Sequence, residues 1–221
     1  MLGNVKMSGV STARGVKYAK IHRYLADIVE SNFCICEAGC GSGLITLELL
    51  LTTGIDKAVL LDVDLNILKS AKELFRKFER ELEHVNILFE VGDVQNLPHK
   101  DESFDIVFNE GVIEHVKDMR KAVKEMVRVS RKYIVIFIPN YYDPLWRILK
   151  RMKRMRGKWE FDKYGIEKDI THWQVVKWLK EEGCRKINLL ELGCMKRDLL
   201  FPKTMKSYIG IIAVKGRGDE R

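Results

Sequence analysis

Short apolar runs alternate with amphipathic helical patterns along this chain, and that alternation restricts its fold more than any other feature of the sequence. Apolar runs of this length are typical of buried strands, and the helical patterns between them indicate crossover connections. We expect strands over Phe33–Ala38, Ala58–Val63, Asn86–Val91, Phe104–Phe108, Tyr133–Ile138, Arg185–Leu192 and Ser207–Val214. The sequence therefore predicts an α/β protein with a doubly wound, mostly parallel sheet that carries helices on both faces.

Apolar residues that recur every three or four positions mark the helices between these strands. We expect helices over Val16–Glu30, Leu44–Thr53, Ile67–Phe78, Met119–Val127 and Thr171–Gly183. Gly54 follows the second of them at the position where a glycine commonly ends a helix. Thr171 and Gln174 have the spacing of a capping box, which indicates the start of the last helix.

The length of 221 residues and the content of 46% apolar and 32% charged residues favour one globular domain with one core. We take residues 1–221 as that domain, with an N-terminal arm over 1–15 and a frayed polar tail over 215–221. No apolar run approaches the ~20 residues of a membrane span, and residues 1–14 lack the apolar core of a signal peptide. Together with the odd number of cysteines, five, this predicts a cytoplasmic protein. The scarcity of Gln beside abundant Lys, Arg and Glu favours a thermophilic source.

The strongest sign of a binding site is the segment Glu37–Gly43, with the sequence EAGCGSG, between an expected strand and an expected helix. Its glycines let the backbone turn tightly and approach a ligand without an intervening Cβ. About 20 residues further on, Asp62 and Asp64 stand at the end of the next strand, where a carboxylate can accept hydrogen bonds from ribose hydroxyls. This combination alone leaves nicotinamide, flavin and other nucleoside cofactors open.

The spacing of the glycines argues against a dinucleotide. A dinucleotide fingerprint has the pattern G-x-G-x-x-G, and the position of its last glycine is Leu44 here. Glu37 stands beside the loop, where an acidic residue suits a ligand with a cationic amine better than a ligand with a pyrophosphate.

With these residues in view, the chain resembles the class I S-adenosylmethionine-dependent methyltransferases, and most of all their small-molecule branch of ubiquinone-biosynthesis-like enzymes (methyltransferase type 11). The resemblance runs from about Tyr18 to Ile138 and more loosely beyond. Motifs that match in order are EAGCGSG at 37–43, DVDL at 62–65, GDVQNLP at 92–98, SFDIV at 103–107 and VIEHV at 112–116. The resemblance implies a sheet of order 3-2-1-4-5-7-6 with strand seven antiparallel.

The same resemblance implies S-adenosylmethionine as the cofactor and S-adenosylhomocysteine as its product. The implied cofactor-binding residues are Glu37, Gly39, Cys40, Gly41, Gly43, Asp62, Asp64, Leu65, Gly92, Asp93, Val94 and Asn109. Glu37 would face the methionine amino group, and the backbone carbonyl of Asn109 would reach it. Asp64 would bind the ribose hydroxyls, with Asp62 as the alternative, and Asp93 would accept from the adenine amine.

Methyl transfer from a sulfonium needs alignment and exclusion of water more than a protein nucleophile, so few residues have to carry the chemistry. His115 is the candidate general base, because it follows the fourth strand at the mouth of the site and its side chain titrates near neutrality. The alternative for His115 is a structural role at a helix end. Candidates for binding the acceptor are Tyr18, Tyr141, Tyr142, Trp146 and His172.

The segment 143–165 is basic and rich in aromatic residues, with eight Lys or Arg against three Asp or Glu. Leu145, Ile148, Leu149 and Met152 fall on one helical face. We expect this segment to be a lid over a small substrate. A basic amphipathic helix also suits an anionic substrate, a membrane surface or RNA, and a solvated helix that covers the sheet edge is a further alternative.

The sequence thus predicts a methyltransferase that acts on a small-molecule acceptor. An RNA methyltransferase is the first alternative, although Asn109–Val112 lacks the prolines and aromatic ring of loops that grip a base amine. A cofactor-binding regulatory protein without turnover is the second. No metal site is expected, because Cys34 and Cys36 alternate along a buried strand and a four-ligand zinc set is missing. The sequence gives neither the acceptor atom nor the oligomeric state.

Overall fold

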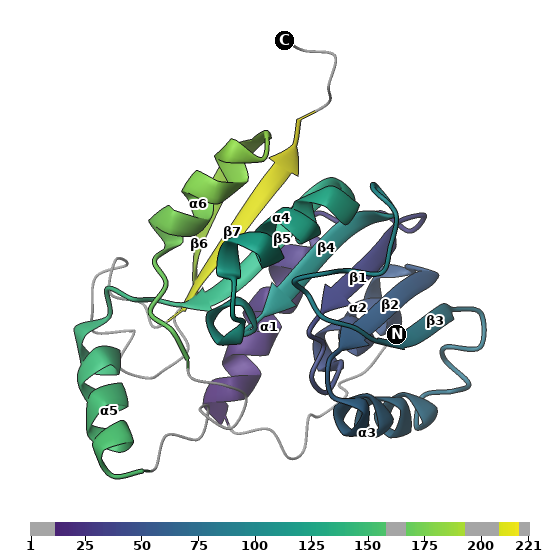
Figure 1. The fold of residues 1–221 in the computed structure, drawn as a ribbon. Helices are drawn as coiled ribbons and strands as arrows, with labels where there is room; N and C mark the ends of the chain where they lie inside the picture. The colour runs from purple at the N-terminus through teal and green to yellow at the C-terminus, as the bar shows by residue number, and fades with distance from the viewer. Residues whose placement is uncertain (1–11, 158–166, 193–207, 217–221) are drawn as a thin grey trace.

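A computed structural model describes residues 12–157, 167–192 and 208–216, and these form one seven-stranded sheet in the order β3-β2-β1-β4-β5-β7-β6 (Figure 1). The strands are β1 (Cys34–Ala38), β2 (Lys57–Asp62), β3 (Asn86–Val91), β4 (Phe104–Glu110), β5 (Ser130–Pro139), β6 (Cys184–Leu192) and β7 (Tyr208–Lys215). β7 pairs antiparallel with both β5 and β6, and the other neighbours are parallel. The predicted fold class and strand order are confirmed.

Six α-helices and one short 3₁₀ helix surround this sheet in the described part of the chain. They are α1 (Thr12–Ala26), α2 (Leu44–Thr53), α3 (Leu65–Arg76), η1 (Ile113–His115), α4 (Met119–Val129), α5 (Pro144–Met155) and α6 (His172–Glu181). In Figure 1, α4 and α6 lie side by side over one face of the sheet. α1, α2 and α3 supply buried residues to the core on the other face.

Alternate residues of the central strands enter the two cores, as a sheet covered on both faces requires. On β4, Val107 packs in the core under α4 and α6, whereas Ile106 and Phe108 pack in the core under α1 and α2. All three are fully buried. This packing fixes the strand register, so the carboxyl ends of β1, β2, β4 and β5 meet at one edge of the sheet.

Several predicted boundaries need correction. The first helix covers Thr12–Ala26 and not Val16–Glu30, so part of the expected arm over 1–15 is helical. Its end comes early because Asp27 and Ile28 form a turn whose amides bond back to Arg23 and Leu25. β4 continues to Glu110, and β7 includes Lys215, whose Nζ donates to the Ser130 carbonyl at 2.9 Å, so the tail is ordered at its start.

The predicted helix signals at Gly54 and Thr171 are confirmed. Gly54 ends α2 with a φ of 72°, in the left-handed region that glycine adopts without steric cost. The hydroxyl oxygen of Thr171 accepts from the amide of Gln174, and the side chain of Gln174 accepts from the amide of Thr171 in return. No helix in the described residues is long and apolar enough to cross a membrane.

Candidate cofactor and acceptor site

The glycine loop after β1 depends on three glycines with positive φ angles, of 81° at Gly39, 53° at Gly41 and 69° at Gly43. Two of them also lack room for a side chain. A Cβ on Gly39 would lie 2.5 Å from a methyl group of Val112, and a Cβ on Gly43 would lie 2.5 Å from a methyl group of Leu60. At Gly41 a Cβ would meet no atom within 4 Å, so the space beside this residue is open to a ligand.

Backbone amides of this loop are already engaged by the protein. The amides of Gly39 and Cys40 donate to the Leu61 carbonyl at 2.7 and 2.9 Å, and the amide of Gly43 donates to the Cys40 carbonyl at 2.8 Å. The amide of Gly41 donates to a side chain of β2, described below. A phosphate-binding loop instead points free amides at its anion. These four amides are therefore unsuited to a pyrophosphate.

Asp62 and Asp64 have different roles in the structure. Asp62 is buried, and its two carboxylate oxygens accept from the amides of Gly41 at 3.0 Å and of Asp64 at 3.1 Å. Asp64 is exposed and caps α3, with one oxygen accepting from the amide of Asn66 at 2.8 Å. Asp62 thus holds the loop in place, while Asp64 presents its second oxygen at the carboxyl edge of the sheet.

Glu37, on β1, is a buried carboxyl group with little compensation. Its side chain accepts a hydrogen bond from the Thr46 hydroxyl at 2.6 Å, and the residue is 2% exposed. Burial raises the pKa of Glu37 to about 8, although the bond from Thr46 lowers it in part. A cationic ligand group beside Glu37 would relieve this cost, because it favours the ionised carboxylate.

The turn after β3 contains the predicted adenine-binding residues. The Asp93 carboxylate accepts from the amide of Gln95 at 2.9 Å and from its side-chain amide at 3.1 Å. Gln95 in turn accepts from the amide of Asp118, which ties this turn to the start of α4. Val94 is buried, and Leu65, at the start of α3, is 53% exposed.

Known proteins that are similar to this chain indicate its family. Residues 36–137 match the methyltransferase domain family. The chain is 35% identical over 124 residues to norajmaline N-methyltransferase of Rauvolfia serpentina, a match that covers 54% of this chain and 42% of the relative. It spans less than half of the length of the curated relatives that it matches first.

Solved structures share the fold of nearly the whole chain. The structure of YcgJ from Bacillus subtilis has a TM-score of 0.64 at 17% identity and covers 91% of this chain and 99% of that one. A possible histamine N-methyltransferase from Thermotoga maritima has a TM-score of 0.62 at 17% identity, with 91% and 92% covered. Residues 36–137 thus form a methyltransferase domain, on a fold that is shared with an S-adenosylmethionine-dependent methyltransferase of known structure. The glycine loop, Glu37 and Asp64 lie in this domain, at or next to the carboxyl ends of β1 and β2.

The carboxyl end of β4 in the methyltransferase domain gathers charged residues that the sequence alone did not single out. Glu110 forms an ion pair with Lys17 of α1 at 2.5 Å, and the Lys17 ammonium lies 4.6 Å from the centre of the Tyr208 ring. Tyr208 begins β7, and a Cβ on Gly111 would lie 3.1 Å from its hydroxyl. The signal available in the sequence was Glu110-Gly111, a charged and flexible pair directly after a buried strand.

Glu114 and His115 share η1, and the structure distinguishes them. Glu114 is 2% exposed, and among the described residues its Oε2 atom has no hydrogen-bond partner. Burial, and to a lesser extent the nearby charge of Glu110, raise the pKa of Glu114 to about 8. His115, the predicted base, is half-buried. Asn109 lies inside β4, fully buried, with its side-chain amide donating to the Met126 sulfur at 3.3 Å.

Three of the predicted acceptor-binding residues come together. The Tyr141 and Tyr142 rings lie 5.4 Å apart edge to face, and the Tyr142 and His172 rings lie 5.6 Å apart. Burial lowers the pKa of His172. Tyr18 is on α1, with the ammonium of Lys17 5.2 Å from its ring centre. The side chain of Trp146 lies outside the described part of the structure, so its predicted role is untested.

Part of the segment predicted as a lid is a helix, and its role as a lid stays a prediction. Residues 144–155 form α5, and Ile148 and Met152, predicted to share one helical face, are 57% and 46% exposed. Residues 158–166 lie outside the described range. Burial raises the pKa of the Cys36 and Cys40 thiols, which suits inert core cysteines, and the described residues hold no cluster suited to a metal ion.

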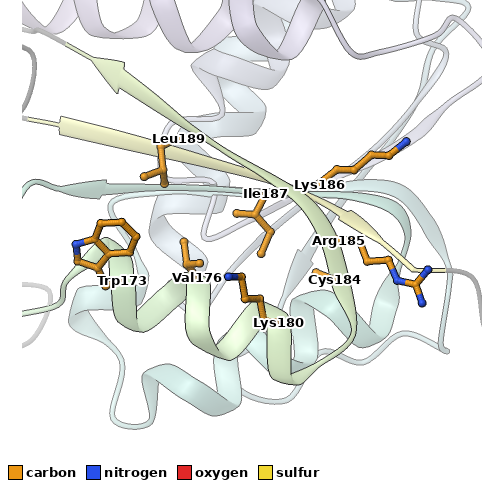
Figure 2. Close-up of a pocket in the computed structure, with 8 residues that line it drawn as sticks. All are labelled: Trp173, Val176, Lys180, Cys184, Arg185, Lys186, Ile187 and Leu189. Carbon is orange, nitrogen blue, oxygen red and sulfur yellow. The ribbon is translucent and has the colours of Figure 1, made fainter. Parts of the chain in front are cut away.

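A pocket of about 240 Å³ lies elsewhere, between α6 and the edge strand β6 (Figure 2). Figure 2 shows Trp173 and Val176 of α6 facing Ile187 and Leu189 of β6 across this space. β4, β5 and β7 separate β6 from β1, which the glycine loop follows, so this pocket is distinct from the glycine loop.

Proposed function

We propose that the protein transfers the methyl group of S-adenosylmethionine to a small organic acceptor bound at the carboxyl edge of the sheet. The observation that carries this proposal is the combination of buried Glu37 with a glycine loop in which the amides of Gly39, Cys40, Gly41 and Gly43 are bonded within the protein. That combination suits a ligand with a cationic amino group and without phosphate. S-adenosylmethionine is such a ligand.

The residues of the site would share the binding as follows. Glu37 would pair with the amino group of the methionine moiety, and the open space at Gly41 would admit that moiety. The free oxygen of Asp64 would accept from the ribose hydroxyls, while Asp62 holds the loop. Leu65 would cover one face of the adenine with its exposed side chain, and Asp93 and Val94 would meet the ring edge.

When bound, S-adenosylmethionine supplies an activated methyl group on a positively charged sulfur. The protein would hold the acceptor in line with this group and exclude water. An acceptor that must lose a proton needs a base, and Glu114 is better placed for this than His115, because its Oε2 is buried and without a partner among the described residues. Tyr141, Tyr142 and His172 would line the acceptor side.

A small acceptor is favoured over RNA. Norajmaline N-methyltransferase, which is similar over 54% of this chain, is named for a small-molecule acceptor. The loop Asn109–Val112 lacks the prolines and aromatic ring of loops that grip a base amine. The aromatic group of Tyr141, Tyr142 and His172 offers apolar rings with few charges, as small-molecule sites commonly do.

Methyl-labelled S-adenosylmethionine tests this proposal. The protein is incubated with the labelled compound and a fractionated metabolite extract, and separately with total RNA, and each fraction is assayed for label. We expect label in a small-molecule fraction, and a large reduction when the Asp64→Asn variant replaces the wild type. Label in RNA alone would show the acceptor class to be wrong. Tight cofactor binding without label in any fraction would favour a regulatory protein without turnover.

A further inference from the structure

The outer face of α5 is apolar. Ile148, Met152 and Met155 are 57%, 46% and 80% exposed, and their spacing of four and three residues puts them on one side of the helix. Figure 1 shows α5 at the periphery of the domain, well apart from the sheet. A surface helix of a globular protein normally turns its apolar stripe toward the core. Among the described side chains of α5, the orientation is the reverse.

Polar contacts hold α5 in this orientation. Lys150, which is 7% exposed, forms ion pairs with Glu167 at 2.9 Å and with Asp169 at 3.2 Å. Arg154 donates to the backbone carbonyl of Glu167 at 2.8 Å. These contacts attach the charged side of the helix to residues 167–169, so the apolar side is held outward. Packing of the core does not explain why α5 is held with these apolar side chains toward solvent.

The charge around the apolar stripe is uniformly positive. Residues 144–157 contain six Lys or Arg and no Asp or Glu. Arg147, Arg151 and Arg156 are exposed, and Arg151 directly precedes Met152 of the stripe. Exposed apolar side chains flanked by arginines are the pattern of helices that lie in the interface of a membrane with anionic lipids. RNA phosphates would contact the arginines, but RNA binding would leave the apolar side chains exposed to water.

We propose that α5 is a membrane-surface helix that docks the protein on anionic lipid. Ile148, Met152 and Met155 would enter the boundary between headgroups and acyl chains, and Arg151 and Arg156 would contact lipid phosphates. Four residues separate β5 from α5, so the helix begins at the carboxyl edge of the sheet that carries the cofactor residues. Docking through α5 would bring this edge close to the lipid surface, from which an apolar acceptor could enter. The inference depends only on α5 and not on the proposed methyl transfer.

Sedimentation with vesicles tests the proposal without cofactor or acceptor. Vesicles of phosphatidylcholine alone and of phosphatidylcholine mixed with phosphatidylglycerol are compared at low and high salt. We expect the wild type to sediment with the anionic vesicles only, and less so at high salt. Absence of binding to anionic vesicles at low salt would overturn the proposal. Equal binding to both kinds of vesicle would overturn the role of the arginines.

Two variants and a matched control assign the binding to α5. The double substitution I148S/M152S removes apolar side chains without a change of charge, and we expect it to weaken vesicle binding about tenfold. R151Q/R156Q should abolish the preference for anionic lipid. The control L88S/L189S removes two exposed apolar side chains from β3 and β6, with exposures of 49% and 41%, and should bind like the wild type.

Comparison of I148S/M152S with the control separates a role of α5 from a general effect of hydrophobicity. If I148S/M152S binds vesicles as well as the wild type, with an unchanged circular dichroism spectrum, α5 is not the docking helix. If L88S/L189S loses binding to the same extent, the effect is general hydrophobicity and the proposal is wrong. If I148S/M152S lowers affinity for RNA but not for vesicles, α5 is a nucleic-acid surface instead.

Discussion

The carboxylate of Asp62 accepts a hydrogen bond from the backbone amide of Gly41 at 3.0 Å. This bond ties the glycine loop after β1 to the end of β2. The other carboxylate oxygen of Asp62 accepts from the Asp64 amide, so both of its oxygens are bonded to backbone amides. The two aspartates of the motif therefore have separate roles: Asp62 holds the loop, and Asp64 is available to a ligand.

Substitution of each aspartate should separate these roles. Asp64→Asn keeps an N-cap for α3 but removes the charge, so we expect unchanged stability and an affinity for S-adenosylhomocysteine that is lower by about tenfold. Asp62→Ala leaves two amides without their acceptor and should lower the free energy of unfolding by about 1–3 kcal/mol. Urea denaturation and calorimetry measure both. Normal affinity in Asp64→Asn with loss of affinity in a stable Asp62→Asn would reverse the assignment.

The glycines of the loop should differ in their response to alanine. Gly43→Ala adds strain at positive φ and a contact of 2.5 Å with Leu60, so we expect a loss of about 2–4 kcal/mol of stability. Gly41→Ala meets no neighbour and should cost about 1 kcal/mol, from its backbone angle alone. The Gly41 variant should nevertheless bind S-adenosylhomocysteine less tightly, because its methyl group enters the open space. Equal destabilisation by the two variants would contradict this packing.

Glu37 should make both stability and cofactor binding depend on pH. Its pKa is about 8 in the folded protein against 4.5 as the ordinary value, so the folded state holds the extra proton between these values. Stability should fall as the pH rises through that window, by at most about 1.4 kcal/mol per pH unit for this group. Glu114, whose pKa is raised in the same way, should add a similar dependence of stability on pH. Urea denaturation from acid to neutral pH should show a shallower slope for Glu37→Gln.

Affinity for S-adenosylhomocysteine should change with pH in the opposite direction. The amino group of the ligand pairs with the ionised carboxylate of Glu37. As the pH rises toward 8, the affinity of the wild type should therefore increase by up to about tenfold per pH unit. Glu37→Gln should bind weakly at every pH. The control Glu48→Gln, on α2, should keep the pH dependence of the wild type. A wild-type affinity that does not vary between pH 6 and pH 8 would exclude Glu37 as the partner of the amino group.

Glu114 and His115 can be distinguished once an acceptor is found. If Glu114 takes the acceptor proton, Glu114→Gln should lower kcat by about 100-fold and His115→Asn should change it little. The pH profile of kcat should also lose its rise toward pH 8 in the Glu114 variant, because that rise follows ionisation of the carboxyl group. A structural role for Glu114 would lower stability without this change of profile. The reverse pattern would restore His115 as the base.

The central features of this fold could be read from the sequence because they depend on local pattern. β3 was predicted to the residue, and the apolar run Asn86–Val91 ends at a glycine, Gly92. The order of the sheet came from a family resemblance, because no local pattern specifies which strands become neighbours. The end of α1 was misplaced, since the apolar residues Ile28 and Val29 continue the helical spacing although the chain turns there to enter β1.

Residues of the site were harder to predict where they depend on contacts between distant elements. The ion pair of Glu110 with Lys17 joins positions 93 residues apart, and the approach of Tyr208 to Gly111 joins β7 to β4. The reversed orientation of α5 depends on Glu167 and Asp169, which the helical pattern does not include. The cytoplasmic location and the thermophilic source stay predictions.

Calorimetric titration of the protein with S-adenosylmethionine, S-adenosylhomocysteine and NAD tests the proposed cofactor site. We expect both sulfur compounds to bind at one site, NAD not to bind, and Asp64→Asn to weaken the binding of the first two alike. Binding of NAD without binding of either sulfur compound would contradict the proposed site.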